Sequence, residues 1–496
     1  MKISLQKAVQ LIEGSIADFS DSTDPVLYKH IYAILKAAIV SGDFPDACEL
    51  PATRKMAETL GYSRSTIIKS YELLRLEGLV KIKGGSGVLV SFKTPVIAIN
   101  ENQSKAQRYP DLSQLGKAFY QNRSRVNPLD DSHISFRPGL PPLDVFPVEQ
   151  WKKQSNRYWQ MIRASELTYH SAVGMDSLRI TLANYLNLSR RIKCDYRQIV
   201  IVGGSLQSLF LIGSLLLNPG DGVFIEEQTF PNVHSVFSGL RAKLIPVPLD
   251  NEGLMVEPIA KLKTRNLKLM HVTPSCQYPL GMQLSQSRRA ELVSFAQKKN
   301  LYLIENDYEH EVNQTIDPAN SLFNLDQTDR TFYISTFNRV LHPSIRVGFM
   351  VVPKHLIEPM STLIRHSHLF VSPSIQLVLR SFIEQKVLHQ HIAKLGKAIN
   401  ERKQIFEERL SQLKNKRVKA EFFSIPSLHM LIHLPADVAD VKLANKLQEE
   451  GIIVHPMSKC AVGEHKQNGL IIGYASTRPQ QMEAKMTVLL RALEKV

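Results

Sequence analysis

The chain has 496 residues, 44% of them hydrophobic and 22% charged, and a formal net charge of +15. This length predicts two or more globular domains, and the composition excludes a disordered chain. The four cysteines are widely spaced and include no Cys-x-x-Cys pair, so neither a disulfide framework nor a structural zinc site is expected. The net charge favours a polyanionic partner.

No membrane segment or signal peptide is predicted. The longest apolar segment, residues 209–217, has about half the length that a membrane-spanning helix needs. The first residues lead into no long apolar run. We therefore expect a cytoplasmic protein.

Residues 1–24 are interpreted as an N-terminal extension. They carry apolar side chains at Ile3, Leu5, Val9, Leu11 and Ile12. This pattern leaves a docking helix and a docking strand equally open.

Residues 25–92 predict three helices and a hairpin. Apolar residues at three- and four-residue spacing follow Pro25, and a second helix follows Pro51. Ser63 is a typical N-cap for a third helix, and the turn before it is only Gly61-Tyr62, which is helix-turn-helix geometry. Alternating residues on both sides of residues 84–87 then predict a β-hairpin, which completes a winged helix.

The charge of this region indicates a DNA-binding surface. Between Pro51 and Pro95 there are eight Lys and Arg and three Glu, a balance of 8 − 3 = +5. The third helix begins with short polar side chains and Arg64, and its N-terminal amides also face phosphate. Taken singly, such charges are ordinary solvated residues, but together with the turn and the hairpin they predict DNA binding.

The motifs of this region resemble the GntR-type winged helix. The resemblance is carried by Leu50-Pro51-Ala52-Thr53-Arg54, by residues 60–67, by Tyr71-Glu72-Leu73-Leu74 and by Gly85-Ser86-Gly87. One departure is Asp46-Ala47, where the family has Pro-Gly. From the resemblance and the charge pattern we expect double-stranded DNA to contact Arg54, Ser63, Arg64, Ser65, Thr66, Lys69, Lys83, Ser86 and Gly87.

Residues 93–135 show little periodicity and several polar runs, so they are predicted to be a linker. Beyond residue 136 short apolar strands alternate with helices, which predicts an α/β domain over 136–384 with a mostly parallel sheet. A smaller α/β subdomain is expected over 385–496. The predicted strands cover residues 198–202, 222–226, 242–247, 267–272, 301–305, 331–335 and 427–433.

These landmarks resemble the fold type I aminotransferases. Phe136-Arg137-Pro138-Gly139-Leu140-Pro141 matches the start of that domain, and Tyr169, Gly174 and Leu178-Arg179 match a loop beside its substrate. With the winged helix, the whole chain resembles the MocR subfamily of GntR regulators. The resemblance implies a DNA-binding transcriptional regulator, a head-to-tail homodimer with pockets between subunits, and pyridoxal 5′-phosphate as the family cofactor.

The phosphate end of the implied cofactor site is complete. Ser205 and Leu206 lie at a strand-to-helix turn, where backbone amides hold phosphate. Thr336 and Arg346 stand where the family also contacts the phosphate. These four residues are the expected cofactor-binding set.

The reactive end departs from the family. Its motif Thr-Phe-Ser-Lys here reads Thr336-Phe337-Asn338-Arg339, so Arg339 stands at the Schiff-base lysine position. A guanidinium stays protonated and cannot attack an aldehyde. Asn306 replaces the aspartate that pairs with the pyridine nitrogen. Leu280 and Ile471 are further departures, and the expected pocket consists of Phe230, Cys276, Asn306, Tyr308 and Arg339, with no catalytic residue and no metal.

Three hypotheses remain open at this point. The first is a regulator whose aminotransferase-like domain dimerises and senses a small ligand, which could be pyridoxal phosphate bound without a covalent link. The second is a DNA-binding scaffold with an empty pocket. The third is a pyridoxal-phosphate-dependent aminotransferase with an appended DNA-binding module.

Overall fold

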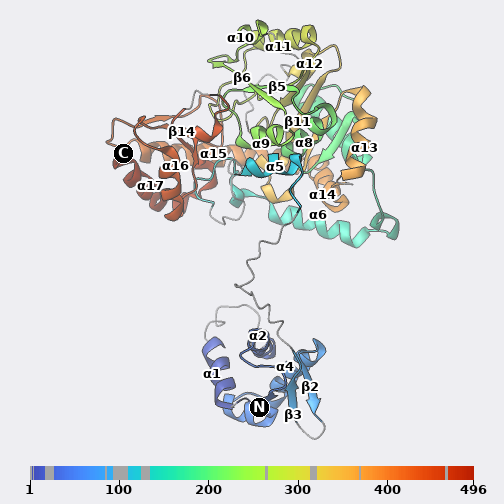
Figure 1. Cartoon of the computed structure of the whole chain (residues 1–496), viewed down its shortest axis with the longest axis vertical. Helices are drawn as coiled ribbons and strands as arrows, with labels where there is room; N and C mark the ends of the chain where they lie inside the picture. Colours follow the sequence, from blue (N-terminus) through green and yellow to red (C-terminus); the bar gives the residue numbers. More distant parts are fainter. Residues whose placement is uncertain are drawn as a thin grey trace. The chain divides into compact units, whose positions relative to one another are not determined.

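The chain forms two compact units, Met1–Pro110 and Asp111–Val496, in a computed structural model (Figure 1). The structure describes residue 3 and residues 5–16, 27–83, 87–92, 110–123, 134–262, 266–312, 321–367, 370–463 and 467–496.

The N-terminal unit is a winged helix with one additional helix at its start. Its helices are α1 (Leu5–Ile16), α2 (Leu27–Val40), α3 (Thr53–Leu60) and α4 (Arg64–Leu76), and its strands are β1 (Glu49–Leu50), β2 (Val80–Lys83) and β3 (Gly87–Val90). The extension is therefore helical where the structure describes it, and Ile12 of α1 is buried in the same core as Ile31 and Leu74. The predicted hairpin pairs β2 with β3, and β1 adds a third antiparallel strand that the sequence did not reveal.

Two turns of this unit, at Gly61 and at Ala47, have residues with positive φ. Gly61 ends α3 in the left-handed conformation at φ 68°, which glycine adopts without steric cost. Ala47, at the departure from the family pattern, also has a positive φ of 61°, and its amide donates to Val90 O at 2.9 Å. The departure therefore changes a turn beside β3 and leaves the predicted DNA-facing helix intact.

A helix lies inside the segment that was predicted to be a linker. α5 (Gln114–Gln121) begins after Ser113, whose side chain accepts a hydrogen bond from Gly116 N at 3.0 Å. It belongs to the second unit and packs on α9 (Pro231–Gly239). The sequence analysis missed this helix because eight residues among polar neighbours show too little periodicity.

The second unit is built on a seven-stranded sheet of order β4-β12-β11-β10-β9-β5-β6. β12 runs antiparallel to both of its neighbours, and the other pairs are parallel. The predicted mostly parallel sheet is thus confirmed, while the antiparallel strand was not predicted. The strands are β4 (Ile199–Val202), β5 (Gly222–Glu226), β6 (Lys243–Val247), β9 (Leu267–Val272), β10 (Tyr302–Asn306), β11 (Thr331–Thr336) and β12 (Gly348–Val351).

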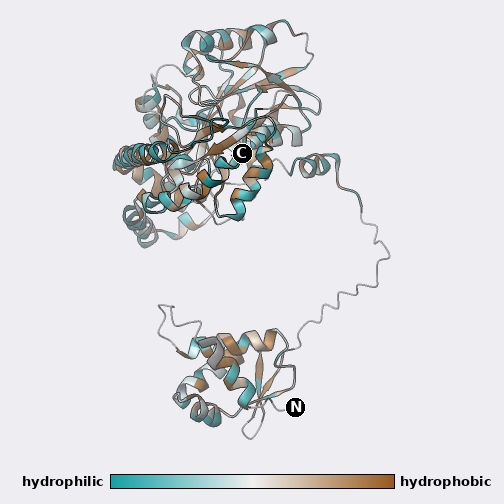
Figure 2. Ribbon diagram, turned by 90° about the vertical axis from the view of Figure 1, so that its left-hand side faces the viewer, coloured by the Kyte–Doolittle hydropathy of each residue, from teal (hydrophilic) through white to brown (hydrophobic). Residues whose placement is uncertain are grey.

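Helices cover both faces of this sheet. Ile199 and Ile201 of β4 enter one cluster of buried apolar side chains, whereas Val200 and Val202 enter another. Figure 2 shows the strands of this unit largely in the colour of hydrophobic residues. The helices are α6 (Val148–Met161), α7 (Asp176–Arg190), α8 (Ser205–Leu216), α9, α10 (Glu257–Ala260), α11 (Gln286–Lys299), α12 (Leu322–Leu325), α13 (Ile357–Ser367) and α14 (Pro373–Glu384), and a short hairpin joins β7 (Leu249–Asp250) to β8 (Gly253–Leu254).

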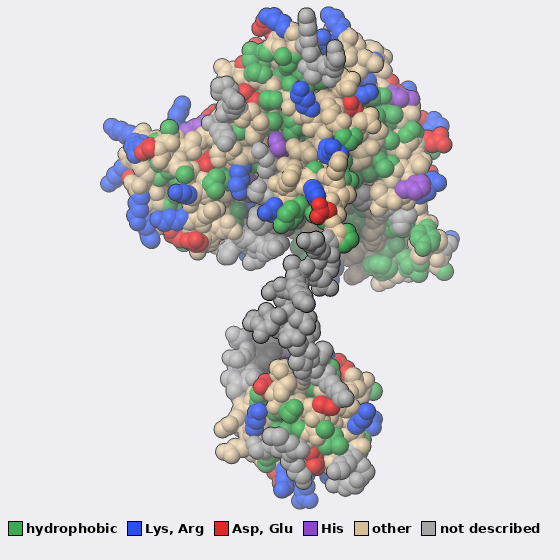
Figure 3. Space-filling model, viewed as in Figure 1, with side chains coloured by type: hydrophobic (Ala, Val, Ile, Leu, Met, Phe, Trp, Pro, Cys, Tyr) green, Lys and Arg blue, Asp and Glu red, His purple; other side chains and the backbone are tan. Residues whose placement is uncertain are grey.

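A smaller subdomain follows the long helix α15 (Val387–Leu410). Its four-stranded antiparallel sheet has the order β13-β14-β16-β15, and Lys and Arg side chains are frequent on its visible surface (Figure 3). The elements are β13 (Lys419–Glu421), β14 (Met430–His433), α16 (Asp440–Glu449), β15 (His455–Pro456), β16 (Gly469–Ile472) and α17 (Pro479–Glu494). In the part of the chain that is described, no helix combines the length and the apolar character needed to cross a bilayer.

Candidate functional site

The start of α4 presents polar side chains to solvent. Ser63 caps the helix, since its Oγ accepts a hydrogen bond from Thr66 N at 3.2 Å. The same Oγ lies 2.8 Å from Ser65 Oγ and 2.7 Å from Thr66 Oγ1. Ser63, Arg64 and Ser65 are exposed, so this end of the helix is open to a groove of DNA.

The other predicted DNA contacts lie on α3, α4 and the hairpin. Arg54 is exposed and pairs with Glu58 at 3.0 Å, and Lys69 lies with its Nζ 5.5 Å from the ring centroid of Tyr28. Gly87 opens β3, where an added Cβ would lie 2.8 Å from a carboxylate oxygen of Glu49. The side chain of Lys83 and all of Ser86 fall outside the described residues.

The start of α8 in the second unit is where the sequence predicts a phosphate site. β4 ends at Val202, and Gly204 with φ 121° turns the chain so that the first amides of α8 are not used within the helix. Thr336 ends β11, next to Asn338. Two buried oxygen atoms here, Ser205 Oγ and Asn338 Oδ1, have no hydrogen-bond partner among the described residues. The Ser205 hydroxyl can donate a hydrogen bond to an anionic ligand, whereas Asn338 Oδ1 only accepts and needs a donor.

Arg346 contributes a cation to the same region. Its backbone adopts the left-handed conformation at φ 50°, after the short 3-10 helix Pro343–Ile345. A Cβ added at Gly203 would lie 4.0 Å from Arg346 Nη2. The structure therefore brings Arg346 close to the start of α8, although the two are more than 130 residues apart; its predicted contact with phosphate stays a prediction.

Arg339 is held by a buried carboxylate that the sequence analysis did not single out. Its Nη1 lies 3.2 Å from Glu309 Oε1, and the side chains are 11% and 0% exposed. The guanidinium also faces the rings of Tyr308 and Phe230, at 5.1 and 5.7 Å from their centroids. Gly139 packs against it so closely that an added Cβ would lie 2.7 Å from Arg339 Cζ.

The remaining pocket residues form an apolar wall around this ion pair. Tyr308 donates its hydroxyl to Cys276 O at 2.8 Å, and Phe230 packs on Tyr278 with ring centroids 4.4 Å apart. Burial raises the pKa of the Cys276 thiol well above its usual range, so this thiol is not a nucleophile. Ile471 is fully buried in the same cluster as Tyr308.

Asn306 is paired with a neutral histidine. Its Nδ2 lies 3.1 Å from His271 Nε2, on the neighbouring strand β9. Burial lowers the pKa of His271 to about 3, so the imidazole carries no charge at neutral pH. Neither side chain supplies the negative charge that would stabilise a protonated pyridine nitrogen.

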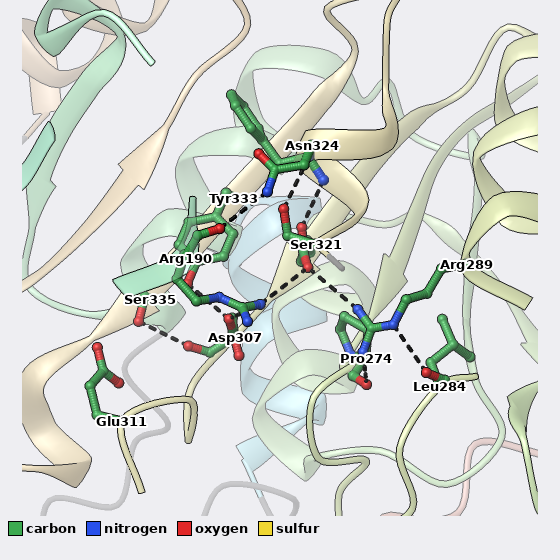
Figure 4. A network of polar contacts seen from close by, with 12 residues as sticks. Arg190, Pro274, Leu284, Arg289, Asp307, Glu311, Ser321, Asn324, Tyr333 and Ser335 are labelled. Atoms are coloured by element: carbon green, nitrogen blue, oxygen red, sulfur yellow. Dashed lines mark hydrogen bonds and ion pairs between the residues drawn. The ribbon is translucent and has the colours of Figure 1, made fainter. Parts of the chain in front are cut away.

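The next residue, Asp307, takes part in a buried polar network with Arg190 and Tyr333. It lies 2.6 Å from Arg190 Nη2, and Tyr333 donates a hydrogen bond to it at 2.8 Å (Figure 4). Burial, the largest influence, would raise the pKa of Asp307, but the charge of Arg190, together with His310, Ser275 and the hydrogen bond from Tyr333, keeps the pKa below its ordinary value. The carboxylate is thus committed to a buried network and does not replace the one absent at Asn306.

Four of the five predicted pocket residues, Phe230, Cys276, Tyr308 and Arg339, are linked by contacts, whereas Asn306 contacts His271. The sequence analysis missed the partner Glu309. The available signal was an additional carboxylate within the motif Glu305-Asn306-Asp307-Tyr308-Glu309. No local pattern pairs it with a residue 30 positions further along the chain.

Comparison with known proteins identifies both parts of the chain. Residues 136–489 match the family described as Aminotransferase class I and II. The chain belongs to this family. Residues 27–90 match a second family, described as Bacterial regulatory proteins, gntR family.

Similar proteins of nearly the same length are named as regulators. The Probable rhizopine catabolism regulatory protein MocR of Rhizobium meliloti is 28% identical over 464 residues, which are 92% of each chain. The HTH-type pyridoxine biosynthesis transcriptional regulator PdxR of Corynebacterium glutamicum is 24% identical over 89% of this chain and 90% of its own. With the gntR match, these relatives confirm the predicted DNA-binding transcriptional regulator.

Solved aminotransferases share the fold of the second unit. The kynurenine aminotransferase of Pyrococcus horikoshii aligns with a TM-score of 0.66 and 23% identity, over 80% of this chain and 98% of its own. LysN, an α-aminoadipate aminotransferase of Thermus thermophilus, gives a TM-score of 0.68 at 21% identity, over 77% and 99%. The predicted fold class is confirmed.

Proposed function

We propose that the second unit of this regulator binds a small phosphorylated ligand without a covalent link and thereby controls DNA binding. In this proposal Arg339 stands at the position of the Schiff-base lysine, and the unit performs no aldimine chemistry. The observation that carries the proposal is the contrast between unpartnered polar atoms at the start of α8 and a buried ion pair at Arg339.

The phosphate end supports a ligand of this kind. The unused amides of α8, the unpartnered Ser205 Oγ and the guanidinium of Arg346 are complementary to a dianionic phosphate ester. Thr336 and Leu206 flank the same turn. Pyridoxal 5′-phosphate or another phosphorylated vitamer fits this end.

The other end does not fit the chemistry of pyridoxal phosphate. The amine of a lysine attacks an aldehyde only when it loses its proton, whereas the Arg339 guanidinium is charged and paired with Glu309. Asn306 supplies an amide where a pyridinium requires a carboxylate. No catalytic residue is therefore assigned.

The regulator is further proposed to act as a head-to-tail homodimer. Large apolar side chains are exposed on α6, on α7 and in the segment between them: Trp159 is 57%, Leu167 67%, Tyr169 82% and Leu188 83% exposed. A second copy of the chain would bury such a surface. Two winged helices would then read paired half-sites of DNA, and a bound ligand would shift their relative placement.

The proposal is tested by thermal unfolding of the full-length protein with pyridoxine 5′-phosphate, pyridoxal 5′-phosphate and their unphosphorylated forms. We expect the phosphorylated compounds to raise the melting temperature, because a ligand that binds only the folded state stabilises it. Arg346→Ala should remove most of this effect. A melting temperature that no phosphorylated compound changes would contradict the proposal.

Absorbance spectroscopy separates this function from an aminotransferase. Added pyridoxal phosphate should give no aldimine band and no covalent adduct after borohydride reduction. We expect the same of Arg339→Lys, because Glu309 would hold the new amine in its protonated form. A covalent adduct and transamination by the wild-type protein would establish the enzyme instead.

A further inference from the structure

A pocket of about 340 Å³ lies between α5, α8 and α9. Its walls are mainly apolar, and it also has polar side chains and one cation. Phe119 lines it from α5, Leu206 and Phe210 from α8, Asn232 and Val236 from α9, and Arg346 from the loop before β12.

Two of these residues also belong to the proposed phosphate site. Leu206 lies in the first turn of α8, and Arg346 approaches the same turn. Among the described residues no carboxylate pairs with the Arg346 guanidinium. The pocket is therefore continuous with the place where the phosphate of a ligand would bind.

α5 packs on α9. The ring of Phe119 packs against Gly239, where an added Cβ would lie 2.7 Å from Phe119 Cζ, and its centroid is 6.1 Å from that of Phe210. None of the residues of α5 is fully buried. A helix of eight residues is marginal in water by itself. The position of α5 hence depends on the packing of Phe119 against Gly239 and Phe210, and a ligand that touches Phe119 would add to this packing.

We propose that this pocket is a subsite for the apolar part of the phosphorylated ligand, and that Phe119 of α5 is a ligand-contacting residue. The inference rests on the proposed function and adds that the ligand holds α5 against α9. In the sequence, residues 93–113 separate the winged helix from α5. A ligand that holds α5 would thus act on the part of the second unit that directly follows this segment in the chain.

Hydrogen exchange of the full-length protein tests the subsite, with pyridoxine 5′-phosphate and inorganic phosphate as probes. Pyridoxine 5′-phosphate should slow the exchange of amides in residues 116–121, because binding stabilises docked α5. Inorganic phosphate, which lacks an apolar part, should protect the start of α8 only.

Phe119→Ala should abolish the protection of α5 and weaken the binding of pyridoxine 5′-phosphate about tenfold. Tyr120→Ala is the matched control, since Tyr120 is exposed and stacks on Arg123 outside the pocket. Gly239→Ala adds a methyl group where the Phe119 ring packs and should displace the ring. It should therefore reproduce the effect of Phe119→Ala.

The outcomes separate the two proposals. If pyridoxine 5′-phosphate binds and protects α8 but not α5, or if Phe119→Ala binds it as tightly as the wild type, the subsite is wrong and the proposed function stands. If neither probe binds, both proposals are wrong.

Discussion

Arg339 and Glu309 form an ion pair whose two charges are removed from water. Separating charges from water costs several kcal/mol for each ion, and the mutual attraction compensates only while both partners are present. The contacts with Tyr308 and Phe230 add a second source of stabilisation for the guanidinium. At this scale Arg339, which the sequence predicts at a catalytic position, is largely buried and paired.

Removing one member of this pair should therefore destabilise the second unit. We expect Arg339→Met to lower its free energy of unfolding by about 3 kcal/mol, because Glu309 is left buried and unpaired. Arg339→Met combined with Glu309→Gln should recover much of this loss. Thermal unfolding of the wild type and the two variants measures both effects.

The exposed pair of Arg380 and Glu384 provides the control, and Arg380→Met should change stability little. If Arg339→Met is as stable as the wild type, the pair contributes nothing to the fold.

Glu226 gives the second unit a pH dependence. Its carboxyl group is fully buried at the end of β5, and burial raises its pKa to about 7, although Thr273 donates hydrogen bonds to it from N and Oγ1. The folded-state pKa lies above the unfolded value. The stabilisation is thus complete below about pH 4.5 and is lost as the pH rises through 7.

Glu226→Gln should remove this part of the pH dependence. Between pH 4.5 and 8 the wild type should lose roughly 3 kcal/mol of stability relative to the variant. Denaturant unfolding at both pH values measures the difference. Glu311, whose pKa burial also raises to about 7, keeps a similar slope in both proteins. Equal pH profiles would show that Glu226 titrates normally.

At the scale of elements, the side chain of Ser63 caps α4 and is also expected to lie beside DNA. Ser63 satisfies the amide of Thr66 and stands beside Arg64, where a groove of DNA is expected. The two roles are separable because serine and aspartate both cap helices, whereas only aspartate adds a negative charge.

Ser63→Ala should lower the stability of the N-terminal unit by about 1 kcal/mol. Ser63→Asp should retain the stability but weaken DNA binding more strongly, because its charge faces phosphate. Thermal unfolding and gel retardation at low salt measure the two quantities. Ser113→Asp makes the same change at the cap of α5 and should leave DNA affinity in the absence of ligand unchanged. Equal DNA affinity of Ser63→Asp and the wild type would remove this end of α4 from the interface.

At the scale of the whole molecule, a homodimer predicts a dependence on half-site spacing. Two half-sites on the same face of DNA should bind much more tightly than one, since the second contact is intramolecular. Inserting five base pairs turns one half-site by about half a helical turn and should weaken binding at least roughly tenfold. Gel retardation measures the effect, and a protein insensitive to the insertion would be acting as a monomer.

The sequence by itself determined the features that local patterns encode. The cap at Ser63, the left-handed Gly61 and the apolar strands predicted the winged helix and the mostly parallel sheet. A single position, Arg339, was enough to argue against a Schiff base, because a guanidinium has the same chemistry in any fold.

Only the tertiary structure decided which distant residues meet. Glu309 faces Arg339, Phe119 rests on Gly239, and Asp307 is taken by Arg190. Each contact joins residues 30 or more positions apart, so no periodicity along the chain reports it. These contacts form only when the strands and helices pack, because packing brings side chains from distant parts of the sequence into contact.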